Sequence, residues 1–204
     1  MTARRSPLLV GAIALAFALS ACGSGSPPSS SAGPASIPGV RTLDFTAKQF
    51  HLHFLGPLQY AQNPPFGGAH SPVPLNCGVY PTTVPNENAV HSLEHGAVWL
   101  TYKPGVDPAP LAALTSIDQS YTLVSPYPDQ SSPVVASAWG LQLGVDSPTD
   151  PRLRQFVSDY VGNGLGEEKG ARCAGASPEE AVQLRDNPPQ QNSSPPPIPA
   201  DRAG

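Results

Sequence analysis

Residues 86–102 of the chain, NENAVHSLEHGAVWLTY, contain a helix pattern that passes directly into a strand pattern. Asn86 can cap the helix, Glu87 suits its first turn, and Gly96 can end it. The following residues, Ala97–Tyr102, are mostly β-branched and aromatic, which favours a strand. A short helix followed at once by a strand indicates a fold in which helices pack on a sheet.

The segments after this stretch continue the same mixture of elements. We expect a helix over Pro108–Ile117, strands over Tyr121–Ser125 and Pro133–Trp139, a helix from Pro151 capped by Thr149 or Asp150, and a short helix from Ser177. The order strand, helix, strand, strand, helix predicts an α+β fold with a short, mostly antiparallel sheet. Residues 41–180 are one domain's worth of chain, so we expect a single small globular domain there.

The part of this domain that precedes the quoted stretch is irregular in composition. Residues 42–60 contain short extended pieces, including Phe50–Leu55. Residues 61–85 carry so many prolines and glycines that no regular element is expected. Long loops of this kind inside a compact domain are usually functional or disordered.

The N-terminus has the three parts of an export signal. Arg4 and Arg5 give a positive start, Leu8–Leu19 is almost entirely apolar, and small residues lead to Cys22. The apolar run is shorter than the roughly 20 residues that a spanning helix needs. The end of the signal resembles the lipobox of bacterial lipoproteins, which implies cleavage after residue 21 and acylation of Cys22. A plain secretory signal that happens to end near a cysteine is the alternative.

The regions that flank the domain are polar and rich in Pro, Gly and Ser. We expect residues 22–40 to form a flexible tether behind a lipidated Cys22, and residues 181–204 to form a disordered Pro-rich tail. Acyl chains on that cysteine would hold the protein on the outer face of the cell membrane. The membrane is therefore the first expected partner.

The charge of the chain argues against nucleic acid as a second partner. Cleavage after residue 21 would remove two arginines and no acid, which lowers the 11 basic residues to nine against 15 acidic ones. The mature net charge of about −6 does not provide the basic patch that phosphate neutralisation requires.

Two cysteines remain once Cys22 carries lipid. In an oxidising compartment, a disulfide between Cys77 and Cys173 is the simplest account of an even number. The alternative is a redox-active or metal-binding thiol pair, which the absence of a Cys-x-x-Cys motif disfavours.

All five histidines lie between residues 51 and 95: His51, His53, His70, His91 and His95. His91 and His95 are four residues apart, so on a helix both rings lie on one face, with Glu94 beside them. Neutral imidazole suits divalent transition metals such as zinc and copper. We therefore predict a metal site from His91, His95 and Glu94, completed by His70 and His53. The alternative is that the same side chains form a structural hydrogen-bond network.

The motif His-x-x-Glu-His also matches that of inverted zinc peptidases. Such an enzyme needs a distant acidic ligand, and the candidates are Glu167, Glu168, Glu179 and Glu180. Nucleophile-elbow, phosphate-loop and dinucleotide motifs are absent, and Met1 is the only methionine. The sequence therefore names no catalytic residue and favours a role other than catalysis.

Four segments resemble a bacterial family catalogued as domain of unknown function 3105: YAQNPPFGGAH at 60–70 with His53 before it, NCGVY at 76–80, AVHSLEHGAVW at 89–99, and VVASAWG at 134–140. The resemblance covers about residues 48–175. It implies a secreted or membrane-tethered protein with one such domain, and no activity. It also implies that the family shares a set of polar residues: His53, His70, His91, Glu94 and His95. Cys77 and a late cysteine belong to the same set.

Two hypotheses follow for the function. The first is a membrane-anchored extracytoplasmic lipoprotein that binds a divalent transition metal. The second is a non-enzymatic cell-envelope module whose Pro-rich segments contact wall polymer or another protein. A metal-dependent hydrolase is a third and weaker alternative.

Overall fold

The computed structural model describes residues 37–43, 52–188 and 201–202, all within one compact unit of the chain, Ala32–Gly204. The predicted signal peptide, Cys22 and His51 lie outside these residues, as does much of the predicted tether and tail. No helix in the described ranges is long and apolar enough to cross a membrane.

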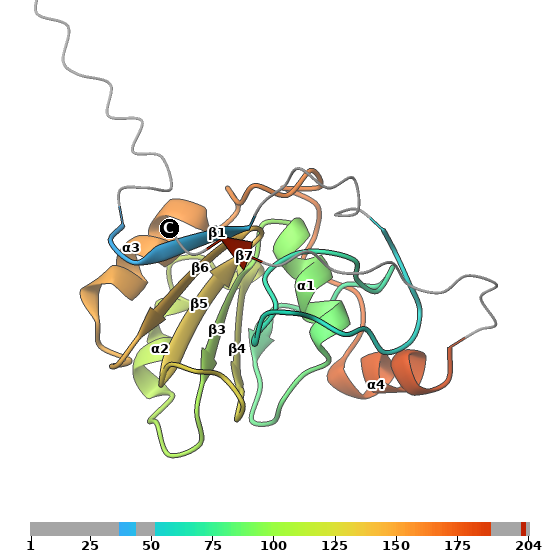
Figure 1. Ribbon diagram of the computed structural model, residues 1–204, viewed down its shortest axis with the longest axis horizontal. Helices are drawn as coiled ribbons and strands as arrows, with labels where there is room; N and C mark the ends of the chain where they lie inside the picture. The colour runs from blue at the N-terminus through green and yellow to red at the C-terminus, as the bar shows by residue number, and fades with distance from the viewer. Residues whose placement is uncertain (1–36, 44–51, 189–200, 203–204) are drawn as a thin grey trace, which may run out of the picture. The chain divides into compact units, whose positions relative to one another are not determined.

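In the described residues, seven strands form one sheet in the order β2-β4-β3-β5-β6-β1-β7 (Figure 1). Their bounds are β1 Val40–Leu43, β2 Gly78–Val79, β3 Val98–Tyr102, β4 Thr122–Pro126, β5 Val134–Ala138, β6 Leu141–Val145 and β7 Asp201–Arg202. Four of the six neighbouring pairs are antiparallel, and β4 runs parallel to both β2 and β3. The predicted α+β class with a mostly antiparallel sheet is confirmed.

Four α-helices accompany the sheet in the part of the chain that the structure describes: α1 Asn86–Glu94, α2 Ala109–Leu114, α3 Pro151–Tyr160 and α4 Pro178–Asp186. The two C-terminal helices start as predicted. The Asp150 side chain accepts from Arg152 N at the start of α3, and Ser177 forms a capping box with Glu180 in α4. Helix α2 is shorter than expected and ends at Leu114.

The predicted cap of α1 is wrong by one position. The N-cap residue is Pro85, and no side chain caps the helix. Asn86 lies inside the helix, where its amide nitrogen donates to the Tyr127 hydroxyl at 3.2 Å instead. The other end is as predicted, because Gly96 follows the last turn with a φ of 101°, a conformation that glycine adopts at little cost.

The two faces of the sheet carry two separate hydrophobic clusters. On β3, Val98 and Leu100 belong to a cluster shared with α2 and α3, whereas Trp99 belongs to a cluster shared with α1. This alternation follows from the two-residue period of a strand. In Figure 1, α1 accordingly lies on one side of the sheet and α2 and α3 on the other.

Strand β6 was not expected from the sequence. It pairs with β5 through a two-residue turn, Trp139 and Gly140, in which Gly140 has a φ of 74°. Leu141, Leu143 and Val145 alternate with Gln142 and Gly144, which is a strand pattern that the prediction did not use. The segment 61–85 forms only the two-residue strand β2 and isolated bridges, close to the irregular course predicted.

Candidate metal centre

Helix α1 is buried along most of its length because the irregular segment before it packs against it. Every residue from Glu87 to Glu94 is buried. The Ser92 hydroxyl accepts from Leu75 N at 3.0 Å and donates to Leu75 O at 2.8 Å. The Asn88 amide donates to Val73 O at 2.7 Å. Polar side chains of α1 thus satisfy loop backbone that could not otherwise be buried.

A short backbone pairing brings the first two histidines together. His70 N donates to Leu52 O at 3.0 Å and Phe54 N donates to His70 O at 2.7 Å, so His53 and His70 face each other across an isolated bridge. Their ring centroids are 4.9 Å apart. The indole of Trp139 packs edge-on against the buried His70 ring at 5.4 Å. His53 is exposed, so this pair joins the surface to the interior.

Three imidazoles are held in one tautomer by backbone carbonyls. Their Nδ1 atoms contact carbonyl oxygens as follows: His70 with Gly68 at 2.7 Å, His91 with Ser71 at 2.6 Å, and His95 with Arg172 at 2.6 Å. A carbonyl oxygen only accepts, so Nδ1 must carry the proton in each ring. In the neutral ring, Nε2 then presents a lone pair. Metal-binding histidines are commonly oriented by such a contact from the other nitrogen.

The Nε2 side of the rings meets a buried carboxylate. One ligand atom from each of His53, His70, His91 and Glu94 lies within 4.8 Å of every other. His70 Nε2 and Glu94 Oε2 are 2.8 Å apart, with side chains 0% and 1% exposed. Two acceptors do not approach so closely unless a positive charge, either a proton or a metal ion, lies between them. This group, which we call the buried cluster, can therefore hold a cation.

A second group lies beside the buried cluster and shares one ring with it. Glu168 Oε2 is 3.1 Å from His95 Nε2 and 3.6 Å from His91 Nε2. His91 and His95 are buried, whereas the Glu168 side chain is 48% exposed. His91 Nε2 receives no hydrogen bond from any residue in the described ranges. We call His91, His95 and Glu168 the outer group.

The environment keeps two of these rings neutral near neutral pH. Burial, followed by the electrostatic effect of His70, lowers the pKa of His91 to about 4. Burial, followed by the effect of His70, also lowers the pKa of His53. Neutral imidazole is the form that binds a metal ion, so proton competition at these two rings is weak.

The predicted ligands divide between the two groups. His53, His70, His91 and Glu94 converge in the buried cluster, which could bind metal. His95 does not join them and lies with His91 and Glu168 in the outer group. The reason is that its Nδ1 donates to a carbonyl of the chain after α3, which turns the ring towards that segment.

Glu168 is a ligand candidate that the predicted metal set omitted. The sequence analysis named Glu168 only as one of four candidates for the distant acidic zinc ligand that an inverted zinc peptidase would need. That alternative also needs Glu94 to face an ion held by the outer group. Glu94 instead approaches His70 in the buried cluster, away from the position that a general base would take.

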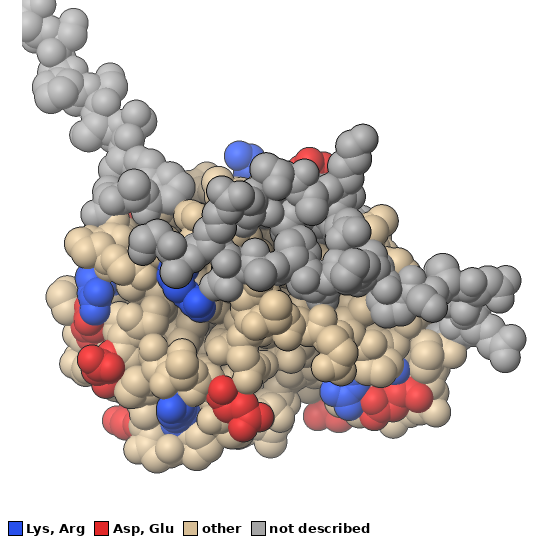
Figure 2. All heavy atoms as spheres, viewed as in Figure 1, with Lys and Arg blue, Asp and Glu red and all other residues tan. Residues whose placement is uncertain are grey.

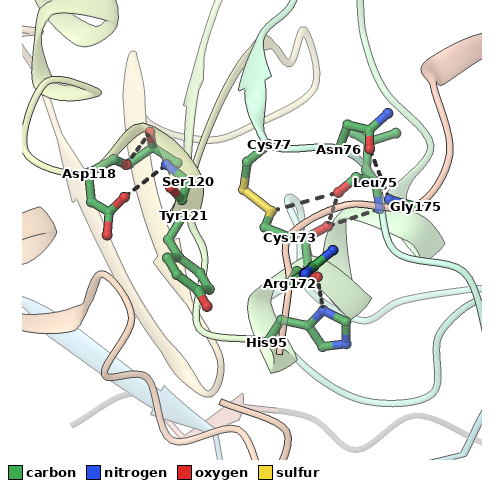
Figure 3. The surroundings of a disulfide bond; sticks show 12 residues. Leu75, Asn76, Cys77, His95, Asp118, Ser120, Tyr121, Arg172, Cys173 and Gly175 are labelled. Carbon is green, nitrogen blue, oxygen red and sulfur yellow. Dashed lines mark hydrogen bonds between the residues drawn. A yellow bond between two sulfur atoms is a disulfide. The ribbon is translucent and has the colours of Figure 1, made fainter. Parts of the chain in front are cut away.

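Cys77 and Cys173 form a disulfide with a Cα–Cα distance of 5.4 Å, as the sequence indicated (Figure 3). Cys77 N also donates to Cys173 O at 3.0 Å. Figure 3 shows Arg172, next to Cys173, accepting from the His95 ring. The disulfide thus fixes the segment that orients His95 and carries Glu168.

On the face drawn in Figure 2, basic and acidic side chains are interspersed among mostly uncharged residues, and no extended basic patch is visible there.

Comparison with known proteins gives a family but no function. No curated protein and no solved structure matches the chain significantly. The model of one family, described as "Protein of unknown function (DUF3105)", matches residues 51–175. The match spans more than half of the 204 residues and contains every residue of the buried cluster and the outer group. The chain is therefore a member of the DUF3105 family.

Proposed function

We propose that this protein is a lipid-anchored extracytoplasmic metal-binding protein whose buried cluster holds one divalent transition-metal ion. His53, His70 and His91 would supply three imidazoles, and Glu94 would supply one carboxylate oxygen. Three nitrogens and one oxygen suit zinc in a tetrahedral site, and also copper(II). With four protein ligands the site would be closed, which fits storage, sensing or a structural role better than catalysis.

One observation carries this proposal: buried hydrogen-bond acceptors of His70, His91 and Glu94 face each other. The carbonyl contacts of His70 and His91 direct their Nε2 atoms towards the same space as the carboxylate of Glu94. A metal ion would satisfy all of these acceptors at once. Bonds of about 2.0–2.1 Å imply roughly 3.3 Å between the ligand atoms of a tetrahedron, so side chains whose ligand atoms lie within 4.8 Å of one another would move inwards to bind the ion.

The test of metal binding is titration of the chelator-stripped full-length protein, purified in detergent, with zinc and with copper(II). We expect about one equivalent to bind tightly. Replacing both His70 and His91 with asparagine should abolish this binding, because asparagine can keep a donor near the position of Nδ1 but has no Nε2 atom. Stoichiometric binding by the double variant would contradict the proposal and favour a structural histidine network in an envelope interaction module.

The membrane anchor is a separate part of the proposal. It is supported by the lipobox-like residues before Cys22 and by the disulfide, which fits an oxidising compartment. In a bacterial host, labelled palmitate should be incorporated into the wild type, and the protein should sediment with membranes. A Cys22→Ser variant should lose the label and the membrane association. Equal labelling of both forms would contradict lipidation at this residue.

A further inference from the structure

We propose that the outer group, His91, His95 and Glu168, is a second metal position through which an ion enters and leaves the buried cluster. This inference rests on the proposed metal-binding function and adds a route to it. It concerns how the ion reaches a site in which three of the four ligands, His70, His91 and Glu94, are buried and His53 is exposed.

The geometry of the outer group already suits a small divalent ion. Tetrahedral coordination with bonds of about 2.0–2.1 Å separates ligand atoms by roughly 3.3 Å. The Glu168 oxygen lies 3.1 Å from His95 Nε2 and 3.6 Å from His91 Nε2, on either side of that value. Small side-chain movements would bring all three atoms to bonding distance.

Each group has one exposed ligand, His53 in the buried cluster and Glu168 in the outer group, and the carboxylates of the two groups differ in exposure. The Glu168 side chain is 48% exposed, whereas that of Glu94 is 1% exposed. A hydrated cation can therefore meet Glu168 first and exchange its water for the two imidazoles behind it. Three protein ligands leave one coordination position for water or another incoming ligand. An open position of this kind permits ligand exchange, which a closed four-ligand site resists.

His91 links the two positions. Its Nδ1 donates to Ser71 O at 2.6 Å, so only Nε2 can bind a metal, and it can bind one ion at a time. The ring centroid of His91 is 4.5 Å from that of His95 and 4.8 Å from that of His70. An ion can therefore remain on His91 while it exchanges His95 and Glu168 for the inner ligands.

The segment that carries Glu168 is fixed against α1. Gly170 N donates to His95 O at 3.0 Å. Gly166 lies so close to the backbone of Glu94 that a β-carbon there would clash with it. These contacts hold Glu168 in front of the histidines without including it in the buried cluster.

The test compares zinc exchange in Glu168→Gln and Glu167→Gln variants of the full-length protein. Glutamine keeps the shape of the side chain and removes its charge, and Glu167 provides a matched control because it is the neighbouring exposed carboxylate. Loaded protein is mixed rapidly with an excess of a zinc-sensitive chelating dye, and loading is followed in the reverse mixing. We expect Glu168→Gln to bind about one equivalent but to load and release zinc at least tenfold more slowly. Glu167→Gln should behave as the wild type.

Each other outcome has a distinct meaning. If the wild type binds neither zinc nor copper(II), the proposed function itself fails. If it binds zinc and Glu168→Gln exchanges it at the wild-type rate, the second position alone is refuted. If Glu168→Gln remains folded by circular dichroism and loses stoichiometric zinc, Glu168 belongs to a single merged site, and a separate entry position is again refuted.

Discussion

Replacing Glu94 with glutamine separates the two explanations of the buried cluster, a metal site and a structural network. Glu94 is 1% exposed and its carboxylate lies 2.8 Å from His70 Nε2. Glutamine preserves the side-chain shape and can donate an amide N–H to that lone pair. In the absence of metal, a neutral hydrogen bond would replace the contact, and the free energy of unfolding should change by about 1 kcal/mol or less.

The effect on metal binding should be much larger. Structural zinc sites contribute about 10–16 kcal/mol through four ligands, or roughly 2.5–4 kcal/mol for each ligand. Loss of one ligand should therefore weaken binding by about two to three orders of magnitude. At a zinc concentration about 1,000 times the wild-type Kd, binding stabilises the wild type by about 4 kcal/mol. The variant should gain at most about 1.4 kcal/mol under the same conditions.

Thermal unfolding with zinc and with chelator measures both effects together. For a chain of this size, about 4 kcal/mol corresponds to a rise in Tm of roughly 8–16 °C. Glu87→Gln is the matched control, because Glu87 is a buried acid of the same helix that accepts from Leu58 N at 2.8 Å. It should keep the full zinc response. The reasoning is refuted if Glu94→Gln destabilises the metal-free protein by about 3–5 kcal/mol, as a broken buried ion pair would, and leaves the zinc response unchanged.

Three further predictions concern the scaffold and the pH response. Replacing Cys77 and Cys173 with serine should lower the free energy of unfolding by up to about 4–5 kcal/mol and speed zinc release, because the disulfide fixes the segment that carries Glu168; an unchanged urea midpoint would contradict this. Gly166→Ala should lower the Tm by several degrees, because its β-carbon would clash with the backbone of α1, and a wild-type Tm would count against the packing described. The folded-state pKa of His91, about 4, lies below its unfolded value of 6.5, so the unfolded state binds more protons between these values and the metal-free protein should lose up to about 3 kcal/mol as the pH falls through this range. Denaturation in chelator at a series of pH values should show this loss, and His91→Asn should reduce it; an equal pH dependence in both proteins would argue against this assignment.

Local sequence patterns predicted those features that depend on residues only a few positions apart. The four-residue spacing of His91 and His95 predicted neighbouring rings, and their centroids are 4.5 Å apart. Pro151 at a helix start and the apolar run before Tyr102 likewise identified α3 and β3. In these cases the backbone geometry of a single element decides the result.

Contacts between distant segments could not be predicted in the same way. Glu168 lies 73 residues after His95, and their contact depends on the path of the chain between α3 and the disulfide. The orientation of His95 away from the buried cluster depends on the carbonyl of Arg172. A helical face gives the direction of a side chain only roughly, and a hydrogen bond from another segment decides which nitrogen meets which partner.

The order of the strands in the sheet could not be predicted from the sequence either. Strands β1 and β6 have only four and five residues, and neither sequence indicates which strand it pairs with. The parallel pairing of β3 with β4 requires a crossover through α2. Composition marks the existence of such elements, but long-range pairing determines their positions in the sheet.

The central claim is that the buried cluster holds a metal ion, and the most direct test is the metal content of the full-length protein. The protein would be purified in detergent from a bacterial envelope without chelator and without a histidine tag, and its metals measured by elemental analysis. We predict about one equivalent of zinc or copper in the wild type, and none in a variant with asparagine at His70 and His91. A folded, metal-free wild type that also fails to bind either metal on reconstitution would contradict the account.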